Sequence, residues 1–438
     1  MVAKPWALQK SDLSFLDLTG AMLRPWLQRI SGLSVGLLLA GCSTVRLPQQ
    51  PVVIKILRTI NNADAVTSKD YQRLRQISDG LIDQLKGIDP TLRPQLSLTA
   101  TSKFIDEVAQ QTRSGFGPDL IITDSETALG LYQRGLTDPI ALSSDDAVDI
   151  PPSLLNLARA TDGKLVGRPV NQVIQLACFN KDRIATSPAT LADLEAASDH
   201  ANYGFALQLK DLFWSAEAFN ASEAMEVALD DRSPTPEQQE QMTSWLRWLK
   251  SASYQQNIRF LNNQGNLRRA LVKGELDWIT CWSSSLPELR EQLKGRLGTA
   301  SLPQGPAGTV RPTTRLQIWA LGRNSSAAQR TKALAILDFV SKPWAQKTYT
   351  LQSRTSIPVN QKAATIVASK IPGGLRTVEL LQKMSKSDAG SRDHAKARVF
   401  RDPSRYEAVS NALMDTIYDI HSPATATQTI LKTLSDSR

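Results

Sequence analysis

The chain has 438 residues, of which 41% are hydrophobic, and it carries a formal net charge of +9. This length is too great for a single hydrophobic core and favours two lobes. The basic residues form no clustered stripe, which disfavours a nucleic-acid partner, and a mildly basic surface suits a position near an anionic membrane.

The N-terminal segment has the features of a targeting peptide. An apolar stretch, residues 30–40, follows Arg24 and Arg29, and it has the length of a signal peptide rather than of a membrane span. It ends in the run Leu39-Ala40-Gly41-Cys42. This run resembles the bacterial lipobox, whose cysteine becomes lipidated and forms the new N-terminus. The alternative is a buried helix with an incidental cysteine.

Lipidation at Cys42 would remove residues 1–41 as a signal peptide and leave residues 42–50 as a tether. The segment before the apolar stretch is long for a signal peptide, so translation starts at either Met1 or Met22. No later apolar stretch approaches the length of a membrane span, and the sequence therefore predicts no further membrane segment.

Strands alternate with helices in the first part of the body. Short apolar runs predict three strands, at residues 52–57, 95–100 and 119–123. A helical period of apolar residues between Leu74 and Leu85 predicts the first connecting helix, and residues 101–113 predict the second. This alternation is typical of a doubly wound, mainly parallel sheet.

Polar residues follow two of these strands. Ligands of open α/β sheets bind beyond the carboxyl ends of strands, so Arg58 and Asn61 after the first strand are candidate binding residues. Asp124, Ser125 and Glu126 follow the third strand. Their carboxylates suit bidentate hydrogen bonding to sugar hydroxyl groups, whereas the alternative role for Asp124 or Ser125 is to cap the next helix.

The stretch from Asp162 to Ile184 holds two apolar runs, residues 165–166 and 173–179, on either side of Pro169-Val170-Asn171. Because proline removes a ladder donor and fixes φ, we predict a turn there, where the chain leaves one sheet and starts another. The stretch resembles the first crossover between the lobes of the maltose-type extracellular solute-binding proteins of ABC importers. Members of that family carry a similar Asn/Asp-Gly-Lys-Leu…Pro, then an apolar strand, then Tyr/Phe-Asn-Lys-Asp.

Further segments resemble the same family in the expected order and cover most of residues 51–435. Residues 117–136 resemble its element of Pro-Asp, apolar strand, polar loop and helix, whose polar loop faces the ligand. The resemblance makes Asn171 a candidate for binding hydroxyl groups. Phe213 and Trp214 stand at a strand-to-helix turn where family members keep an aromatic facing the ligand, and core packing is the alternative for both.

Residues 265–287 resemble the family element helix-Gly-(apolar strand)-Gly-Pro-Trp-x-x-Pro, whose tryptophan stacks on sugar. An ungapped match puts Trp282 at the family's glycine and Ser284 at its tryptophan, so the aromatic is displaced by two residues. Both are candidate ligand-binding residues. Trp278 lies on the same face of this strand as Trp282 by alternation, and we expect it to pack in the core.

Later segments complete the resemblance. Residues 297–308 resemble a return crossover, and residues 355–359 resemble a third one. The strand at 315–321 re-enters the first lobe, and its Trp319 is a further candidate for ligand contact. Asn324-Ser325-Ser326 predicts a cap of the next helix.

Cys178 and Cys281 each lie inside an apolar run. Two buried thiols are the favoured state, and a single disulfide in an oxidising envelope is the alternative. The three histidines are too scattered along the chain for a metal site or a catalytic triad, and we predict neither a metal nor a cofactor.

These features predict an α/β protein with the two-lobed periplasmic-binding-protein fold and three crossovers that hinge the lobes. The predicted lobes are residues 50–160 with 312–353, and residues 161–311 with 354–435. The resemblance implies a monomeric, lipid-anchored receptor in the cell envelope that captures a sugar or polyol, docks on an ABC permease and has no enzymatic activity. The alternatives are a receptor for an anion or amine, and an envelope glycan hydrolase, which needs paired carboxylates such as Asp124 and Glu126.

Overall fold

The computed structural model describes residues 50–60, 68–99, 103–143, 147–197, 200–308, 313–353, 356–370, 398–400 and 402–436. The predicted signal peptide, Cys42 and Asn61 lie outside these ranges. No helix within them is both long enough and apolar enough to cross a membrane.

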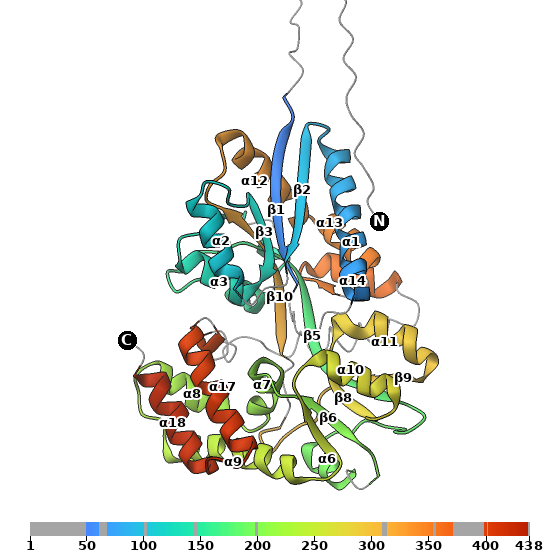
Figure 1. The fold of residues 1–438 in the computed structure, drawn as a ribbon, viewed down its shortest axis with the longest axis vertical. Coiled ribbons are helices and arrows are strands. Elements are labelled where there is room, and N and C mark those ends of the chain that lie inside the picture. The colour runs from blue at the N-terminus through green and yellow to red at the C-terminus, as the bar shows by residue number, and fades with distance from the viewer. Residues whose placement is uncertain are drawn as a thin grey trace, which may run out of the picture. The chain divides into compact units, whose positions relative to one another are not determined.

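Two connected sheets share the long strand β5 (Arg168–Asn180). The other strands of the first sheet are β1 (Val52–Thr59), β2 (Leu92–Thr99), β3 (Leu120–Asp124), β4 (Thr137–Asp138), β10 (Thr314–Gly322) and β11 (Ile357–Pro358). Those of the second sheet are β6 (Tyr203–Ala206), β7 (Ile258–Leu261), β8 (Trp278–Trp282) and β9 (Leu297–Ala300). We call the part of the molecule built on the first sheet lobe 1 and the part built on the second lobe 2 (Figure 1).

Helices connect the strands and flank both sheets (Figure 1). In chain order they are α1 (Ser68–Ile88), α2 (Phe104–Arg113), α3 (Ser125–Gln133), α5 (Pro152–Asn156), α6 (Leu191–Ala197), α7 (Leu209–Ala218), α8 (Ala221–Leu229), α9 (Pro236–Tyr254), α10 (Gln264–Lys273), α11 (Leu286–Leu293), α12 (Ala327–Ser341), α13 (Pro343–Ser353), α14 (Gln361–Lys370), α17 (Pro403–Ile417) and α18 (Pro423–Ser435). Short 3₁₀ turns follow β8 and α11, at Ser283–Ser285 and Lys294–Arg296.

The chain crosses from lobe 1 to lobe 2 within β5, and the predicted turn at residues 169–171 is wrong. Pro169 is the second residue of one continuous strand. It lies opposite Ile318 of β10, whereas Asn171, two residues later, lies opposite the adjacent Gln317. The register of the two strands therefore shifts between Gln317 and Ile318, as at a β-bulge. Proline is tolerated near the start of a strand and at a bulge because the ladder there does not need its missing N–H. The extended backbone therefore continues through the proline into the second sheet.

The directions of the strands decide where a ligand can meet both lobes. β1 and β3 are parallel, β10 is antiparallel to β3, and β5 is antiparallel to β10, so β5 runs with β1 and β3 toward lobe 2. In lobe 2, β8 is antiparallel to β5 and β6 is parallel to β8. The carboxyl ends of β1 and β3 thus point toward lobe 2, and those of β6 and β8 point toward lobe 1.

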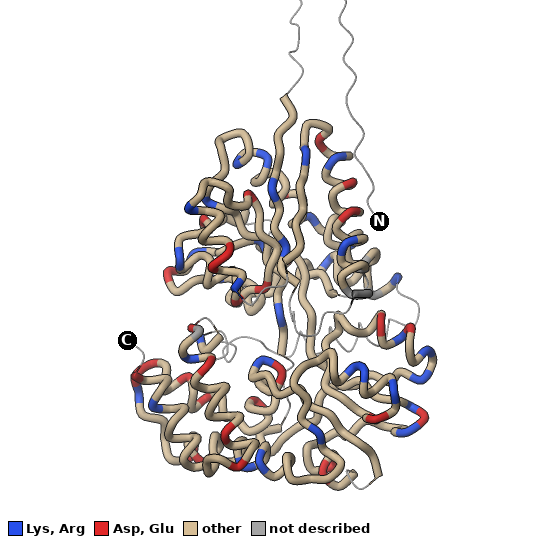
Figure 2. Tube along the Cα trace, in the orientation of Figure 1, with Lys and Arg blue, Asp and Glu red and all other residues tan. Residues whose placement is uncertain are grey.

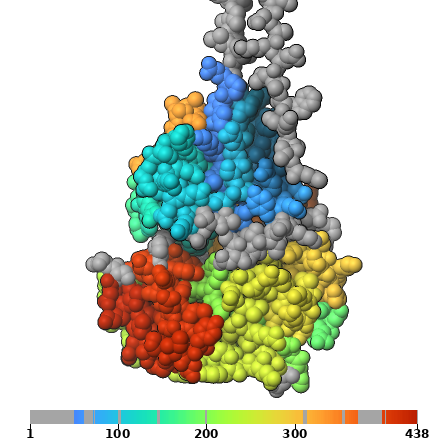
Figure 3. All heavy atoms as spheres, in the orientation of Figure 1, coloured from blue at the N-terminus to red at the C-terminus, as the bar shows by residue number. Residues whose placement is uncertain are grey.

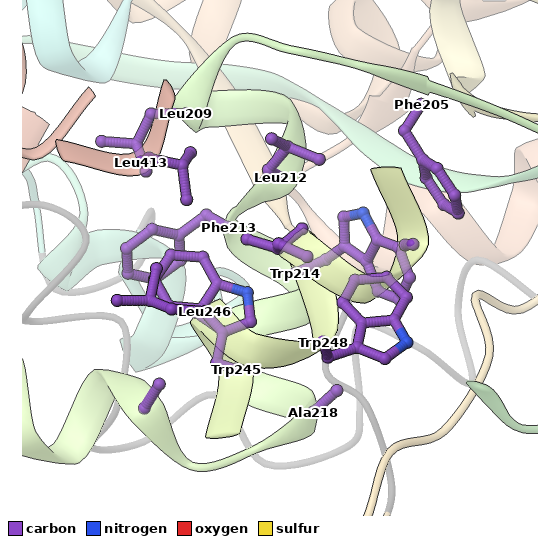
Figure 4. Packing of buried hydrophobic residues seen from close by; sticks show 14 of the residues in the cluster. Phe205, Leu209, Leu212, Phe213, Trp214, Ala218, Trp245, Leu246, Trp248 and Leu413 are labelled. Carbon is purple, nitrogen blue, oxygen red and sulfur yellow. The ribbon is translucent and has the colours of Figure 1, made fainter. Parts of the chain in front are cut away.

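Each lobe has its own apolar core. In lobe 1, Ile54, Ile56 and Leu120 pack against the stripe of α12 that ends at Val340. Ser326 and Gln329 form a capping box at the start of α12, which confirms the predicted cap. In lobe 2, aromatic residues of β6, α7 and α9 form the centre of the core (Figure 4). Helices α17 and α18 pack on α9 and form much of one side of lobe 2 (red in Figure 3).

Cys178 and Cys281 form a disulfide, so the expectation of two free thiols is wrong. β5 and β8 are neighbours, with Cys178 opposite Ile279 and Cys281 opposite Leu176. This register places the two sulfur atoms diagonally across one strand pair. Spacing along the sequence does not contain that information.

Candidate ligand-binding site

Polar residues of three neighbouring strands line up where the lobes meet. Gln317 on β10 lies opposite Asp124 on β3 and opposite Asn171 on β5. Directly opposed residues of antiparallel strands have side chains on the same face, and the Asn171 side-chain amide donates to Gln317 Oε1 at 3.2 Å. Since neighbouring strands are about 4.8 Å apart, the backbones of Asp124 and Asn171 are about 10 Å apart.

The same face continues into lobe 2. Gln175 follows Asn171 by four residues on β5, which is about 13 Å along the strand, and it lies opposite Trp282 at the end of β8. Arg315 precedes Gln317 by two residues and therefore shares its face. The residues that share this face form what we call the polar row: Asp124, Gln317, Asn171, Arg315, Gln175 and Trp282.

Asp211, in the first turn of α7, lies against the lobe 2 end of the polar row. Its Oδ1 accepts a hydrogen bond from Trp282 Nε1 at 2.6 Å, and Arg315 Nη2 is 3.6 Å from the same oxygen. The Arg315 guanidinium carbon also lies 4.0 Å from the centre of the Trp282 ring, a cation–π contact. Gln175 Nε2 donates to the main-chain oxygen of Asp211 at 2.7 Å. All of these side chains are at least nine-tenths buried.

Tyr406 of α17 lies close enough to Asp211 and Arg315 for their charges to affect its pKa. Burial, and after it the negative charge of Asp211, raise the pKa of the Tyr406 phenol, whereas the positive charge of Arg315 opposes that shift. A phenol with a raised pKa keeps its proton at neutral pH, and it can therefore donate a hydrogen bond.

Residues at the carboxyl ends of β1 and β3 form the lobe 1 side. Arg58 is buried, and its guanidinium donates to Tyr349 OH at 2.8 Å and to Ser78 Oγ at 3.3 Å. Thr59 Oγ1 donates to Thr123 Oγ1 at 3.0 Å, which ties the ends of the two parallel strands together. Arg58 lies within β1 rather than after it, and its guanidinium is held by an α1 serine and an α13 tyrosine.

The acidic residues after β3 have structural contacts of their own. Asp124 Oδ1 accepts from the Thr127 backbone N–H at 2.7 Å and caps α3, which confirms the alternative considered for it. Ser125 is buried and donates to Glu126 Oε2 at 3.2 Å. Asp124 and Glu126 are half-buried.

Three predicted aromatic residues lie in the cores. Phe213 and Trp214 are buried in lobe 2, where Trp214 lies beside Trp248 (Figure 4), and Trp319 is buried among the apolar residues of lobe 1. An indole enclosed by other side chains offers no face to a sugar. The structure therefore favours the packing alternative for Phe213 and Trp214, and it gives Trp319 the same environment.

The two tryptophans of β8 have different surroundings. Trp278 packs on Tyr203 and Phe205 and donates to Ser187 Oγ at 2.9 Å, as expected for a core residue. Trp282 ends the strand against Asp211 and Arg315, and Ser284 is exposed in the turn that follows. Trp282 is thus in the predicted place, but a guanidinium covers one face of its ring.

Sequence reasoning missed Gln175, Asp211, Arg315, Gln317 and Tyr349. Gln175, Arg315 and Gln317 had a readable signal, because each is a polar residue within or at the start of an apolar strand run. Asp211 and Tyr349 had none, since an acid in a first helical turn and a tyrosine in a helix are ordinary features.

Charged side chains are mixed on the surface. Figure 2 shows Lys and Arg interspersed with Asp and Glu over both lobes. Within the described ranges, no group of three His, Cys, Asp or Glu side chains could hold a metal ion. The buried Asp211–Arg315 pair is therefore the main electrostatic feature of the polar row.

Comparison with known proteins identifies the family. The model of a family described as bacterial extracellular solute-binding proteins matches residues 95–373, which is more than half of the chain. The chain belongs to this family. No curated protein matches it by sequence.

Solved structures with the same fold as this solute-binding protein include three with named ligands. The GacH receptor of Streptomyces glaucescens, solved unliganded and with acarbose, has a TM-score of 0.70 at 13% identity, over 89% of this chain and all of that one. A solute-binding protein of Thermotoga lettingae with α-D-tagatose has a TM-score of 0.69 at 12% identity, over 87% and 98%. MalX of Streptococcus pneumoniae with maltopentaose has a TM-score of 0.68 at 14% identity, over 87% and 99%.

Proposed function

We propose that this solute-binding protein is a lipid-anchored receptor that captures a sugar or polyol between its lobes and presents it to an ABC permease. The main support for the proposal is that the carboxyl ends of strands in both lobes face each other. The carboxyl ends of β1 and β3 point toward those of β6 and β8, and the polar row joins them. Amide, carboxylate and guanidinium groups in one row suit a solute with many hydroxyl groups.

Three further observations support the sugar assignment. Proteins of the same fold have been solved in complex with acarbose, α-D-tagatose and maltopentaose. Asp124, a half-buried member of the polar row, and the half-buried Glu126 supply acidic groups at the lobe 1 end of the row. The indole of Trp282 lies at the carboxyl end of a lobe 2 strand. A binding role also agrees with the family, whose members are described as solute-binding proteins.

The proposed mechanism is closure of the lobes on the solute. We propose lobes that follow the two sheets, so that the chain crosses between them three times: within β5, between β9 and β10, and after β11, which pairs with β5 in the first sheet. Such crossovers absorb hinge motion, and a solute that contacts both lobes favours the closed form by its differential affinity.

A titration followed by scattering tests this function. We expect a sugar from a panel of maltose, maltopentaose, D-tagatose and sorbitol to raise the melting temperature of the purified protein, because a ligand that binds only the native state stabilises it. At saturation with that sugar, small-angle X-ray scattering should give a smaller radius of gyration. A panel without any thermal shift contradicts the sugar assignment, and an unchanged radius with bound sugar contradicts closure.

Lipid anchoring is a separate part of the proposal. In a bacterial host, the wild-type protein should incorporate a palmitate analogue, and Cys42→Ser should not, because only the cysteine of a lipobox is acylated. A Cys178→Ser variant is the control, since that cysteine lies in a strand of lobe 2. Equal labelling of the wild type and of Cys42→Ser contradicts anchoring at Cys42.

A further inference from the structure

Asp211 is a buried carboxylate with one unsatisfied oxygen. The residue is 0% exposed, and its Oδ1 is held by Trp282 Nε1 and lies near Arg315, as described above. Its Oδ2 has no hydrogen-bond donor among the described residues. A buried acceptor without a donor destabilises the folded protein, and a charged one does so more strongly. An oxygen in this condition can accept a hydrogen bond from a bound solute.

Another buried aspartate of lobe 2 shows the ordinary arrangement. Asp277, at the start of β8, accepts from Arg183 Nε on Oδ1 at 3.2 Å and from the Asn202 backbone N–H on Oδ2 at 2.9 Å. Both of its oxygens are therefore satisfied by the protein. The comparison shows that burial in this lobe does not by itself leave a carboxylate oxygen unpaired.

A second unsatisfied acceptor lies next to Asp211. Gln175 is 0% exposed, and while its amide nitrogen donates to the Asp211 main chain, its Oε1 has no donor within the described ranges. The two acceptors come from different elements, β5 and α7, and both residues contact each other at the end of the polar row. Two neighbouring acceptors suit a solute that donates two hydrogen bonds, as adjacent hydroxyl groups do.

The charges around Asp211 indicate the charge of that solute. Asp211 and Arg315 form a buried pair of opposite charges, so their combined charge is zero. A cationic solute that approached the carboxylate would meet the guanidinium, and an anionic one that approached the guanidinium would meet the carboxylate. Removing Arg315 would take the nearby positive charge away from the buried carboxylate of Asp211. The cluster is therefore suited to a neutral donor.

We propose that Asp211 and Gln175 form the lobe 2 subsite for a neutral, hydroxyl-rich solute. Asp211 Oδ2 and Gln175 Oε1 accept hydrogen bonds from the solute, Trp282 fixes the orientation of the carboxylate, and Arg315 cancels its charge. This inference rests on the proposed sugar-binding function. It adds to it the residues that select a neutral solute over a charged one.

Charge-altering variants test the subsite with maltose, D-tagatose, D-glucosamine and D-glucuronate as probes in calorimetric titrations. The wild type should bind a neutral sugar and neither charged one. Asp211→Asn should weaken neutral binding about 10- to 100-fold, the equivalent of a lost hydrogen bond to a charged group. It should also bind D-glucuronate measurably, because the negative charge of Asp211 no longer repels a carboxylate and the positive charge of Arg315 remains. Arg315→Gln should shift the preference in the other direction, toward D-glucosamine.

Asp277→Asn is the matched control, since it changes an equally buried aspartate of the same lobe. It should lower the melting temperature and leave the affinities for all four probes unchanged. If Asp211→Asn behaves like this control, Asp211 is structural and the inference is overturned. If Asp211→Asn does not fold, Arg315→Gln decides: unchanged selectivity overturns the inference and a gain of D-glucosamine binding supports it. If neither neutral sugar binds the wild type, the sugar assignment fails first and this inference with it.

Discussion

Reduction of the Cys178–Cys281 disulfide should lower the free energy of unfolding by about 4–5 kcal/mol. The two cysteines are 103 residues apart in the sequence, and a cross-link that closes a loop of this size removes a corresponding amount of conformational entropy from the unfolded chain. The bond also ties β5, which both sheets share, to the centre of the lobe 2 sheet. Urea denaturation with and without a phosphine reductant measures the effect through the midpoint and the slope.

A Cys178→Ala/Cys281→Ala double variant is the control for this experiment. It should unfold at lower urea than the oxidised wild type, and its midpoint should not respond to reductant. The wild type and the double variant should then coincide under reducing conditions. A wild-type midpoint that is the same with and without reductant contradicts a stabilising disulfide.

Trp214→Ala should cost about 3–5 kcal/mol of stability, in the range of large-to-small substitutions in a core. The Trp214 ring is 0% exposed and lies 6.2 Å from the Phe205 ring and 6.4 Å from the Trp248 ring, centre to centre. Its removal leaves a cavity among aromatic residues that cannot all move to fill it. The dissociation constant for a bound sugar should change less than threefold, because the ring faces the core.

Trp344→Ala provides the comparison, because Trp344 is about half exposed and contacts the single ring of Phe339. We expect it to cost less than about 1 kcal/mol, since little area is lost from the interior. Chemical denaturation and calorimetry of both variants separate the two roles. If Trp214→Ala melts like the wild type but binds sugar at least tenfold more weakly, the core role is contradicted and Trp214 is a ligand-binding residue.

Local patterns were sufficient for several of the elements, although not for the continuous strand β5. The apolar run at 315–321 became β10, and the period from Leu74 to Leu85 became part of α1. The cap at Ser326 followed from the preference of serine for that position. These features depend on residues within a few positions of each other, which is the range over which a single sequence can be interpreted.

The candidate site was harder to predict because its contacts join distant segments. Asp211 meets Gln175 across 36 residues and Trp282 across 71 residues. Trp214 and Trp282 looked equivalent in the sequence, since each follows or ends a strand. Trp214 lies inside the aromatic core of α7 and α9, whereas Trp282 meets a carboxylate and a guanidinium. Only the packing of α7 against the sheet separates these two environments.

The sequence by itself determined that the chain is an α/β protein, and the resemblance of its motifs was enough to indicate a solute-binding family. The α/β class follows from local periodicity and from the caps of helices, whereas the family followed from the resemblance of several segments to its motifs. The tertiary structure decided the register of β5 against β8 and β10. That register joined Cys178 to Cys281 and put Arg315 over Trp282. The physical reason is that a shift of one residue in strand pairing turns every side chain to the other face, and the sequence of one strand does not state its partner.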